Sequence, residues 1–266
     1  MTELDPSPPT QRGTHVEFST AAVTIPQYRL SALTAIWAAA ALPMAALAWV
    51  AAPVVATAMP GDTPLVPSLL LCLTAGLIWQ FVLVLALVRR EQGTVEWPVL
   101  REALWLRSPR SPRSGRVGGR VWFVLVPAIL VFAAGQFVPS LAIPAGRDFG
   151  AFLESRTGQA FFDGSWGWFT VVVVMGLFNT VLGEELLFRG FLLPRMRGTF
   201  GRADWLANGV MFALYHLHTP WAIPAALLDS LGLALPSRRY RSAWLGITVH
   251  STQTLFISVA VLSVMR

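Results

Sequence analysis

Two adjacent carboxylates and an arginine, Glu184, Glu185 and Arg189, interrupt a stretch of the chain that is otherwise apolar. Residues 166–182, just before them, contain no charged side chain. A charged side chain near the bilayer centre costs about 2.5–3.5 kcal/mol on insertion scales, and such residues usually mark functional sites. We therefore expect the three residues to serve chemistry, with a structural ion-pair network as the alternative.

Histidines reach a similar depth from two other segments. The chain has only four histidines, and three of them, His216, His218 and His250, lie in its C-terminal apolar region. A helix rises about 1.5 Å per residue, so Glu185 and His250 lie about 14 Å, and His216 about 18 Å, from the arginine-rich turns that flank their helices. The hydrocarbon core is about 30 Å thick, so all three lie well inside it. Three segments thus bring a carboxylate and two imidazoles together in depth.

These residue types fit the activation of water. Glu185 and Arg189 are spaced i,i+4 and can pair on one helix face, which leaves Glu184 free for chemistry. A carboxylate with a histidine nearby acts as a general base, and a second imidazole can donate to a tetrahedral oxyanion. The same set, Glu184, His216 and His250, could instead hold zinc, since His₂Glu is a catalytic zinc ligand set. No HExxH motif is present, which excludes the zincin arrangement.

Composition predicts an all-α integral membrane protein. Of 266 residues, 55% are hydrophobic and 13% are charged, against about 25% charged in soluble domains, and the mean hydropathy is +0.58. We expect a polytopic helical bundle of about seven or eight transmembrane helices. Seven segments can be placed, of which the fifth and sixth are short: 30–52, 65–88, 121–143, 166–193, 204–217, 220–235 and 242–265.

The arginines indicate the orientation and the organisation of the chain. The chain has arginine and no lysine, which suggests a GC-rich genome, and we expect a bacterial protein. Eight of the arginines lie in the loop 89–120. By the positive-inside rule this loop is cytoplasmic. We expect residues 1–28 to be a disordered cytoplasmic tail, residues 29–164 to form N-terminal transmembrane helices and residues 165–266 to form a catalytic core. The partners expected are the lipid bilayer of the cell membrane and no nucleic acid.

Three motifs in order resemble a known family. They are Glu184-Glu185-Leu186-Leu187-Phe188-Arg189 (EExxxR), Phe212-Ala213-Leu214-Tyr215-His216 (FxxxH) and His250-Ser251-Thr252-Gln253-Thr254 (HxxxN or HxxxD). The chain resembles the CPBP family of CAAX proteases and bacteriocin-processing enzymes, also called type II CAAX prenyl protease-like or Abi-domain proteins. The resemblance covers about residues 165–266.

The resemblance implies an intramembrane endopeptidase that cleaves a membrane-anchored or lipid-modified protein or a hydrophobic peptide. It implies that Glu184 activates water with help from His216, and that His250 stabilises the oxyanion. Glu185, Arg189, Phe212 and Thr254 would be supporting residues. This mechanism requires no cofactor, and zinc is the metal to consider otherwise.

The third motif departs from the family pattern, because Thr254 stands where the family has Asn or Asp. A lost oxyanion donor typically costs about 10²–10³ in rate. The departure favours an alternative, a non-catalytic membrane scaffold or bacteriocin-immunity protein with the same fold. A proton-coupled transporter is a further alternative, since buried Glu and His residues also serve as proton relays.

Overall fold

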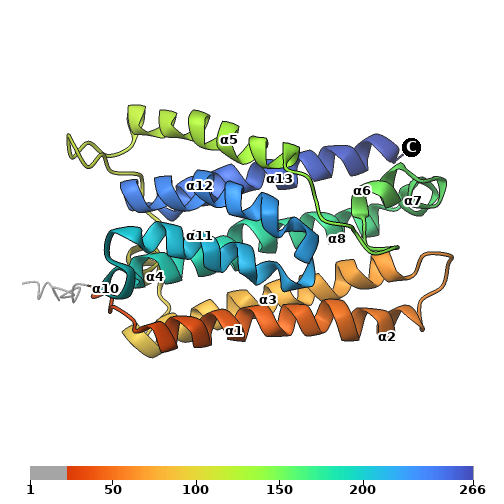
Figure 1. Ribbon diagram of the computed structural model, residues 1–266, viewed down its shortest axis with the longest axis horizontal. Helices are drawn as coiled ribbons and strands as arrows, with labels where there is room; N and C mark the ends of the chain where they lie inside the picture. Colours follow the sequence, from red (N-terminus) through yellow and green to blue (C-terminus); the bar gives the residue numbers. More distant parts are fainter. Residues whose placement is uncertain (1–22, 266) are drawn as a thin grey trace, which may run out of the picture.

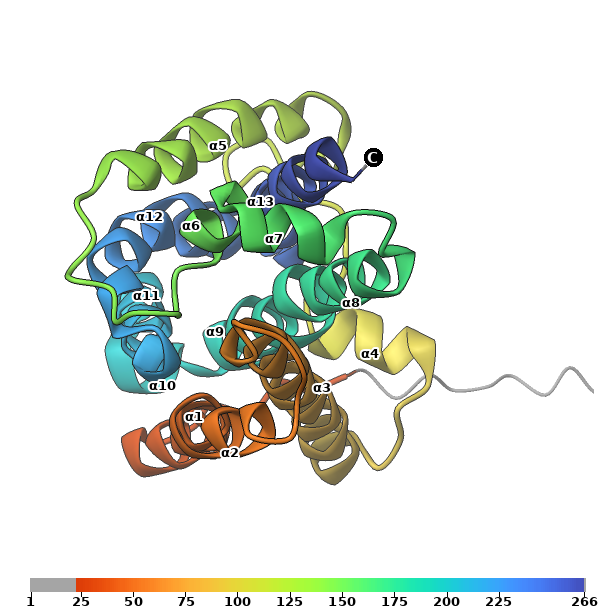
Figure 2. The same ribbon diagram turned by 90° about the vertical axis from the view of Figure 1, so that its right-hand side faces the viewer.

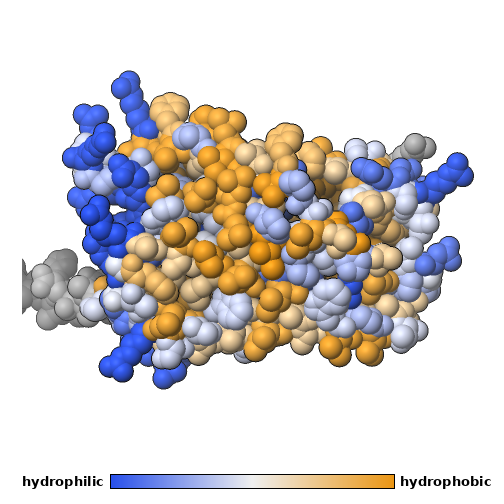
Figure 3. Space-filling model, in the orientation of Figure 1, coloured by the Kyte–Doolittle hydropathy of each residue, from blue (hydrophilic) through white to orange (hydrophobic). Residues whose placement is uncertain are grey.

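The computed structural model describes residues 23–265, and within them the chain is helical, without strands apart from one isolated bridge between Arg110 and Val117. Five of its helical stretches are long and apolar enough to cross a membrane. Figure 3 shows, on the face in view, a broad apolar band between two polar ends. The protein is therefore an all-helical, multi-pass membrane protein.

The five stretches are Leu30–Ala56, Leu65–Gln92, Gly119–Phe137, Trp166–Arg195 and Ala243–Val264. The first comprises α1 (Leu30–Ala46), a π-helical turn η1 (Leu47–Ala51) and α2 (Ala52–Ala56), and the second is the single helix α3. The third comprises η2 (Gly119–Val124), α5 (Leu125–Ala134) and η3 (Gly135–Phe137), and the fifth is α13. The fourth comprises α8 (Trp166–Leu177), η4 (Phe178–Gly183), η5 (Leu186–Leu192) and α9 (Leu193–Arg195).

The expected fifth and sixth spans, 204–217 and 220–235, are instead the two arms of one hairpin. Helix α11 (Asp204–Tyr215) has 12 residues, a length of about 18 Å that cannot cross the hydrocarbon core. Two short 3₁₀ turns, η7 (His216–His218) and η8 (Pro220–Ala222), lead into α12 (Ile223–Tyr240). Figure 1 shows that α11 begins and α12 ends at the same end of the bundle, and that the turn between the two helices lies inside the bundle. The expected seven or eight spans are therefore not confirmed.

Short helices cover the two ends of the bundle. At the arginine-rich end lie α4 (Trp97–Ala103), α10 (Arg197–Phe200) and η6 (Gly201–Ala203), and at the other end lie α6 (Phe149–Glu154) and α7 (Arg156–Phe162). Most of the tail expected to be disordered, residues 1–22, lies outside the described residues. Its last part is in contact with the bundle, since the backbone N–H of Tyr28 donates to the carbonyl of Arg195 at 3.0 Å.

The fourth stretch is the centre of the fold. All residues from Leu186 to Met196 are buried, because α3, α11, α12 and α13 all pack against this stretch. Helix α5 lies at the outer edge, in contact with α12 and α13 (Figure 2). The polar residues expected to do chemistry thus lie on the most enclosed element of the molecule.

Candidate active site

Glu184 and Glu185 lie between two π-helical segments, η4 (Phe178–Gly183) and η5 (Leu186–Leu192). A π-turn widens the helix by one residue and commonly marks a functional site. Gly183 lets this widened helix approach its neighbour, because a Cβ there would meet the Leu77 carbonyl of α3 at 3.0 Å. The carboxylates are 2% and 0% exposed. The local backbone therefore departs from a regular helix where the charges lie.

Glu185 links two helices through one oxygen atom. Its Oε1 lies 3.2 Å from a terminal nitrogen of Arg189, the i,i+4 pair that the sequence predicts. The same Oε1 lies 3.0 Å from Nδ1 of His250 on α13. Gly246, one turn earlier on α13, makes this approach possible, since a Cβ there would come within 2.4 Å of Glu185 Oε2. Glu185 thus contacts Arg189 and His250 through Oε1, while its Oε2 is buried without a hydrogen-bond partner in the described part of the chain.

Glu184 faces a cavity instead. This cavity, called the chamber below, has a volume of about 640 Å³. The three predicted catalytic residues, Glu184, His216 and His250, all line it. Phe212 lines it as well, whereas Glu185 and Arg189 do not. The structure therefore brings the three side chains to one chamber and separates the two glutamates.

Hydrogen bonds and ring contacts fix the two imidazoles. Nδ1 of His216 lies 2.9 Å from the carbonyl oxygen of Phe212, so it must carry the proton and leave Nε2 as an acceptor. Both nitrogens of His250 contact oxygen atoms, Nδ1 that of Glu185 and Nε2 that of Gln253 at 3.2 Å. The ring of Phe212 packs edge-on against both imidazoles and lies 4.0 Å from the Arg189 guanidinium. The two histidines are therefore held differently. His216 keeps Nε2 as an acceptor, whereas His250 lies between two oxygen atoms, those of Glu185 and Gln253.

Residues 166–256 match the model of the type II CAAX prenyl endopeptidase Rce1-like family. The match confirms the resemblance to the CAAX protease-like proteins, and the matching family is one of endopeptidases. No curated protein and no solved structure matches the chain.

The last residue of the third motif, Thr254, lies outside the chamber. The hydroxyl of Thr254 lies 3.2 Å from that of Thr180 and 3.4 Å from the carbonyl oxygen of Gly176, and Thr254 does not line the chamber. Its neighbour Gln253 does line it and contacts His250. The departure from Asn or Asp at position 254 therefore concerns a contact between α13 and α8.

Sequence reasoning missed Gln80 and Tyr215. The amide nitrogen of Gln80 on α3 donates to the Tyr215 hydroxyl at 2.6 Å, and the Tyr215 hydroxyl in turn interacts with the Glu184 carboxyl group. Gln80 and Tyr215 are both fully buried. The available signal was a glutamine in the middle of a long apolar span. Gln80 lies outside the segment that matches the Rce1-like family.

Asp229 of α12 also lines the chamber. Its Oδ1 is buried without a hydrogen-bond partner among residues 23–265 and packs on Gly135, where a Cβ would come within 1.8 Å of it. Asp229 therefore adds a second carboxyl group to the chamber, on the wall formed by α5 and α12.

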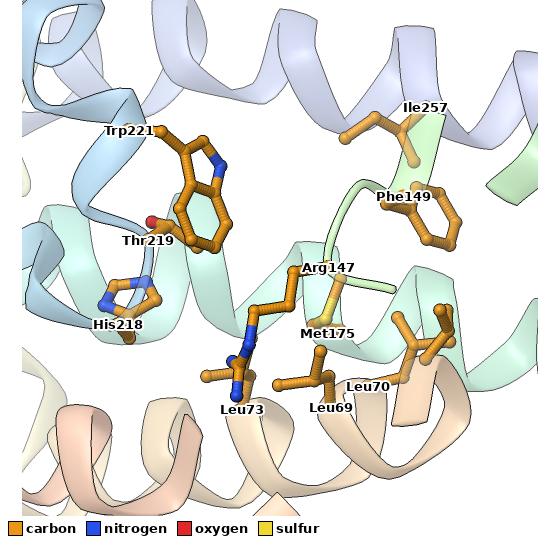
Figure 4. A pocket seen from close by; sticks show the side chains of 11 residues that line it. Leu69, Leu70, Leu73, Arg147, Phe149, Met175, His218, Thr219, Trp221 and Ile257 are labelled. Atoms are coloured by element: carbon orange, nitrogen blue, oxygen red, sulfur yellow. The ribbon is translucent and has the colours of Figure 1, made fainter. Parts of the chain in front are cut away.

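A smaller cavity of about 190 Å³ adjoins the chamber. Figure 4 shows Trp221, Thr219 and His218 along one side of it and Phe149 and Ile257 along the other. The first three residues also line the chamber and so form the wall between the two. Arg147 reaches this cavity, although its guanidinium is already stacked on Trp49 at 3.9 Å and bonded to the Ala48 carbonyl. The smaller cavity is thus mostly apolar, and its one cationic side chain, Arg147, already has partners in the protein.

The set Glu184, His216 and His250 is not arranged as a metal site. Among residues 23–265 no group of three or more His, Cys, Asp or Glu side chains is placed to hold a metal ion. The zinc alternative therefore gains no support from the arrangement of these three side chains.

Proposed function

We propose that this protein is an intramembrane endopeptidase in which Glu184 activates a water molecule for attack on a peptide bond. The observation that carries the proposal is the convergence of Glu184, His216 and His250 on one chamber. The Rce1-like family of residues 166–256 supports the same reaction class. The substrate would be a membrane-anchored or lipid-modified protein, or a hydrophobic peptide.

Glu184 is suited to the role of general base. Glu184 lines the chamber, so its carboxylate can take a proton from a water molecule held there. Nε2 of His216, left as an acceptor by the Nδ1 bond to Phe212, can hold the same water or receive its proton. The water oxygen then attacks the substrate carbonyl carbon, and the proton passes to the leaving amine.

His250 is suited to stabilise the negative charge that develops on the carbonyl oxygen. Its Nδ1 donates to the Glu185 carboxylate, which fixes the ring, and its Nε2 side lines the chamber beside Gln253. A fixed donor aimed at a developing oxyanion is worth about 10²–10³ in rate. Glu185 and Arg189 would act as positioning residues through His250 and Phe212.

The scaffold alternative rested on Thr254. Because Thr254 lies against Gly176 and outside the chamber, its identity no longer argues against catalysis. We propose that the arginine-rich end is cytoplasmic, together with the N-terminus. The substrate would then be cleaved near the cytoplasmic side of the membrane.

The test uses the purified full chain in lipid vesicles with a library of lipid-anchored reporter peptides. Glu184→Gln and His216→Ala should each lower the cleavage rate by about 10²–10⁴, the range for a lost general base, while the thermal midpoint of unfolding is retained. Glu154→Gln, at an exposed position of α6, is the matched control and should cleave at the wild-type rate. Cleavage by Glu184→Gln at the wild-type rate would sink the proposal.

A further inference from the structure

A buried chain of polar side chains runs from α3 to the carboxyl group of Glu184. The Nε2 amide of Gln80 donates to the Tyr215 hydroxyl at 2.6 Å, and the hydroxyl meets Glu184. Gln80 and Tyr215 are 0% exposed and Glu184 is 2% exposed. Gln80 lies nine residues before Arg89, so it is about 14 Å from the arginine-rich end, the depth expected for Glu185 and His250.

The direction of the hydrogen bonds follows from their inventory. A tyrosine hydroxyl has one proton to donate and two lone pairs that accept, whereas an amide NH₂ group only donates. Because Gln80 occupies the oxygen of Tyr215 as donor, the proton of Tyr215 is left for Glu184. A hydrogen bond to a carboxylate is shorter and about twice as strong as one between neutral groups. Tyr215 therefore favours one orientation of the Glu184 carboxylate.

The ring of Tyr215 has little freedom to move away. It packs against Phe188 with ring centroids 5.4 Å apart, against His216 at 5.3 Å and against His218 at 5.2 Å. Tyr215 does not line the chamber, whereas Glu184 does. The hydroxyl thus reaches Glu184 from behind and leaves the chamber side of the carboxylate open.

We propose that Tyr215 is a positioning residue that holds the Glu184 carboxylate toward the chamber, with its proton directed by Gln80 of α3. The inference rests on the proposed function, because the role of Glu184 as base is part of it. It adds a residue of the N-terminal helices, outside the segment matched by the Rce1-like family, to the machinery of the site. The N-terminal half then contributes to catalysis as well as to membrane anchoring.

The kinetic test compares Tyr215→Phe, Gln80→Leu and the double variant in the vesicle assay. Tyr215→Phe should lower kcat about 10- to 100-fold, the equivalent of a hydrogen bond to a charged group, and Gln80→Leu about 3- to 10-fold. KM should stay within about twofold, since substrate contacts are retained. The double variant should be no slower than Tyr215→Phe, because Gln80 acts only through Tyr215. Multiplied losses, or an unchanged kcat in Tyr215→Phe, would overturn the proposal.

Ser230→Ala is the matched control. It removes a buried hydrogen bond between α12 and α11, from the Ser230 hydroxyl to the Gly209 carbonyl at 3.0 Å, without contact to Glu184. It should lower the thermal midpoint about as much as Tyr215→Phe does and leave kcat unchanged. An equal fall of kcat in this control would mean that loose packing, and not the position of Glu184, explains the Tyr215 effect.

An infrared measurement decides the positioning role even without turnover. In protein labelled with ¹³C-glutamate, the Glu184 band is the one that Glu184→Gln removes. The band should shift in Tyr215→Phe and in Gln80→Leu, and stay in place in Ser230→Ala. A band that does not move in Tyr215→Phe refutes the inference. A wild-type protein that cleaves nothing but shows the shift would instead refute the proposed function alone.

Discussion

Oε1 of Glu185 lies 3.0 Å from Nδ1 of His250 and 3.2 Å from a terminal nitrogen of Arg189. One carboxylate oxygen thus ties α13 to the π-helical segment that carries the acidic pair. Arg189 and Glu185 are both 0% exposed, so neither charge is solvated by bulk water. The two glutamates of the motif therefore have different tasks, one facing the chamber and one holding the helices together.

Glu185→Gln should be strongly destabilising. It leaves the Arg189 guanidinium buried without a counter-charge, which costs about 3–5 kcal/mol when a buried pair is broken from one side. The double variant Glu185→Gln with Arg189→Met should recover most of that loss, because no lone charge remains, yet stay slow because His250 has lost its anchor. Thermal unfolding in detergent measures the first effect and peptide cleavage the second. A double variant as unstable as the single one would contradict this account.

Gln253 and Thr254 offer a test with adjacent residues. Gln253→Ala should lower kcat, because it removes the oxygen that contacts Nε2 of His250 at the chamber wall. Thr254→Val keeps the shape that packs on Gly176 and loses hydroxyl contacts outside the chamber, so it should cost about 1 kcal/mol of stability and leave kcat unchanged. The opposite ranking of the two kcat values would show that position 254, where the family has Asn or Asp, is the active one here.

A second buried ion pair should matter for stability and not for chemistry. Arg195 is 0% exposed and binds Glu91 of α3 through two contacts, at 2.8 and 2.5 Å. Glu91→Gln should cost about 3–5 kcal/mol for the reason given for Glu185. The half-exposed pair of Arg107 and Glu102 is the control, and Glu102→Gln should cost at most about 1 kcal/mol. Equal losses in the two variants would mean that burial does not set the value of these pairs.

The titration of Tyr28, which precedes the first span, should lower the stability of the protein at high pH. Burial, together with its hydrogen bond to the Glu91 carboxylate, raises the pKa of Tyr28 from 10.0 to about 12. Between these values the unfolded chain releases the proton and the folded chain keeps it, so stability falls as pH rises from about 10 to about 12. In Tyr28→Phe this part of the pH dependence should disappear. Thermal midpoints measured across that range check it, and parallel curves for the two proteins would refute it.

The hairpin of α11 and α12 makes a topological prediction. Single cysteines at Gly198 and Arg239, in a Cys72→Ser background, should react with an impermeant maleimide from the same side of the membrane. A cysteine at Asp148, beside α6, should react from the other side only. If Gly198 and Arg239 were labelled from opposite sides, α11 and α12 would not form a hairpin that returns to its starting side.

The sequence by itself determined the class of the protein and the residues at issue. Length and hydropathy of each apolar segment are local properties, so the five long spans could be located, and a regular rise per residue placed Glu185, His216 and His250 at a common depth. The i,i+4 pairing of Glu185 with Arg189 is also local, and the structure confirms it.

Only the tertiary structure decided how these elements combine. Whether two short apolar helices cross a membrane or fold back depends on where the turn at His216 and Ala222 sits among its neighbours, which hydropathy does not encode. The rotation of α13, set by its packing against α8 at Gly176, turned Gln253 and not Thr254 to the chamber. Gln80 met Tyr215 across a separation of 135 residues. Such contacts arise from packing between distant segments, and no local pattern in the chain specifies them.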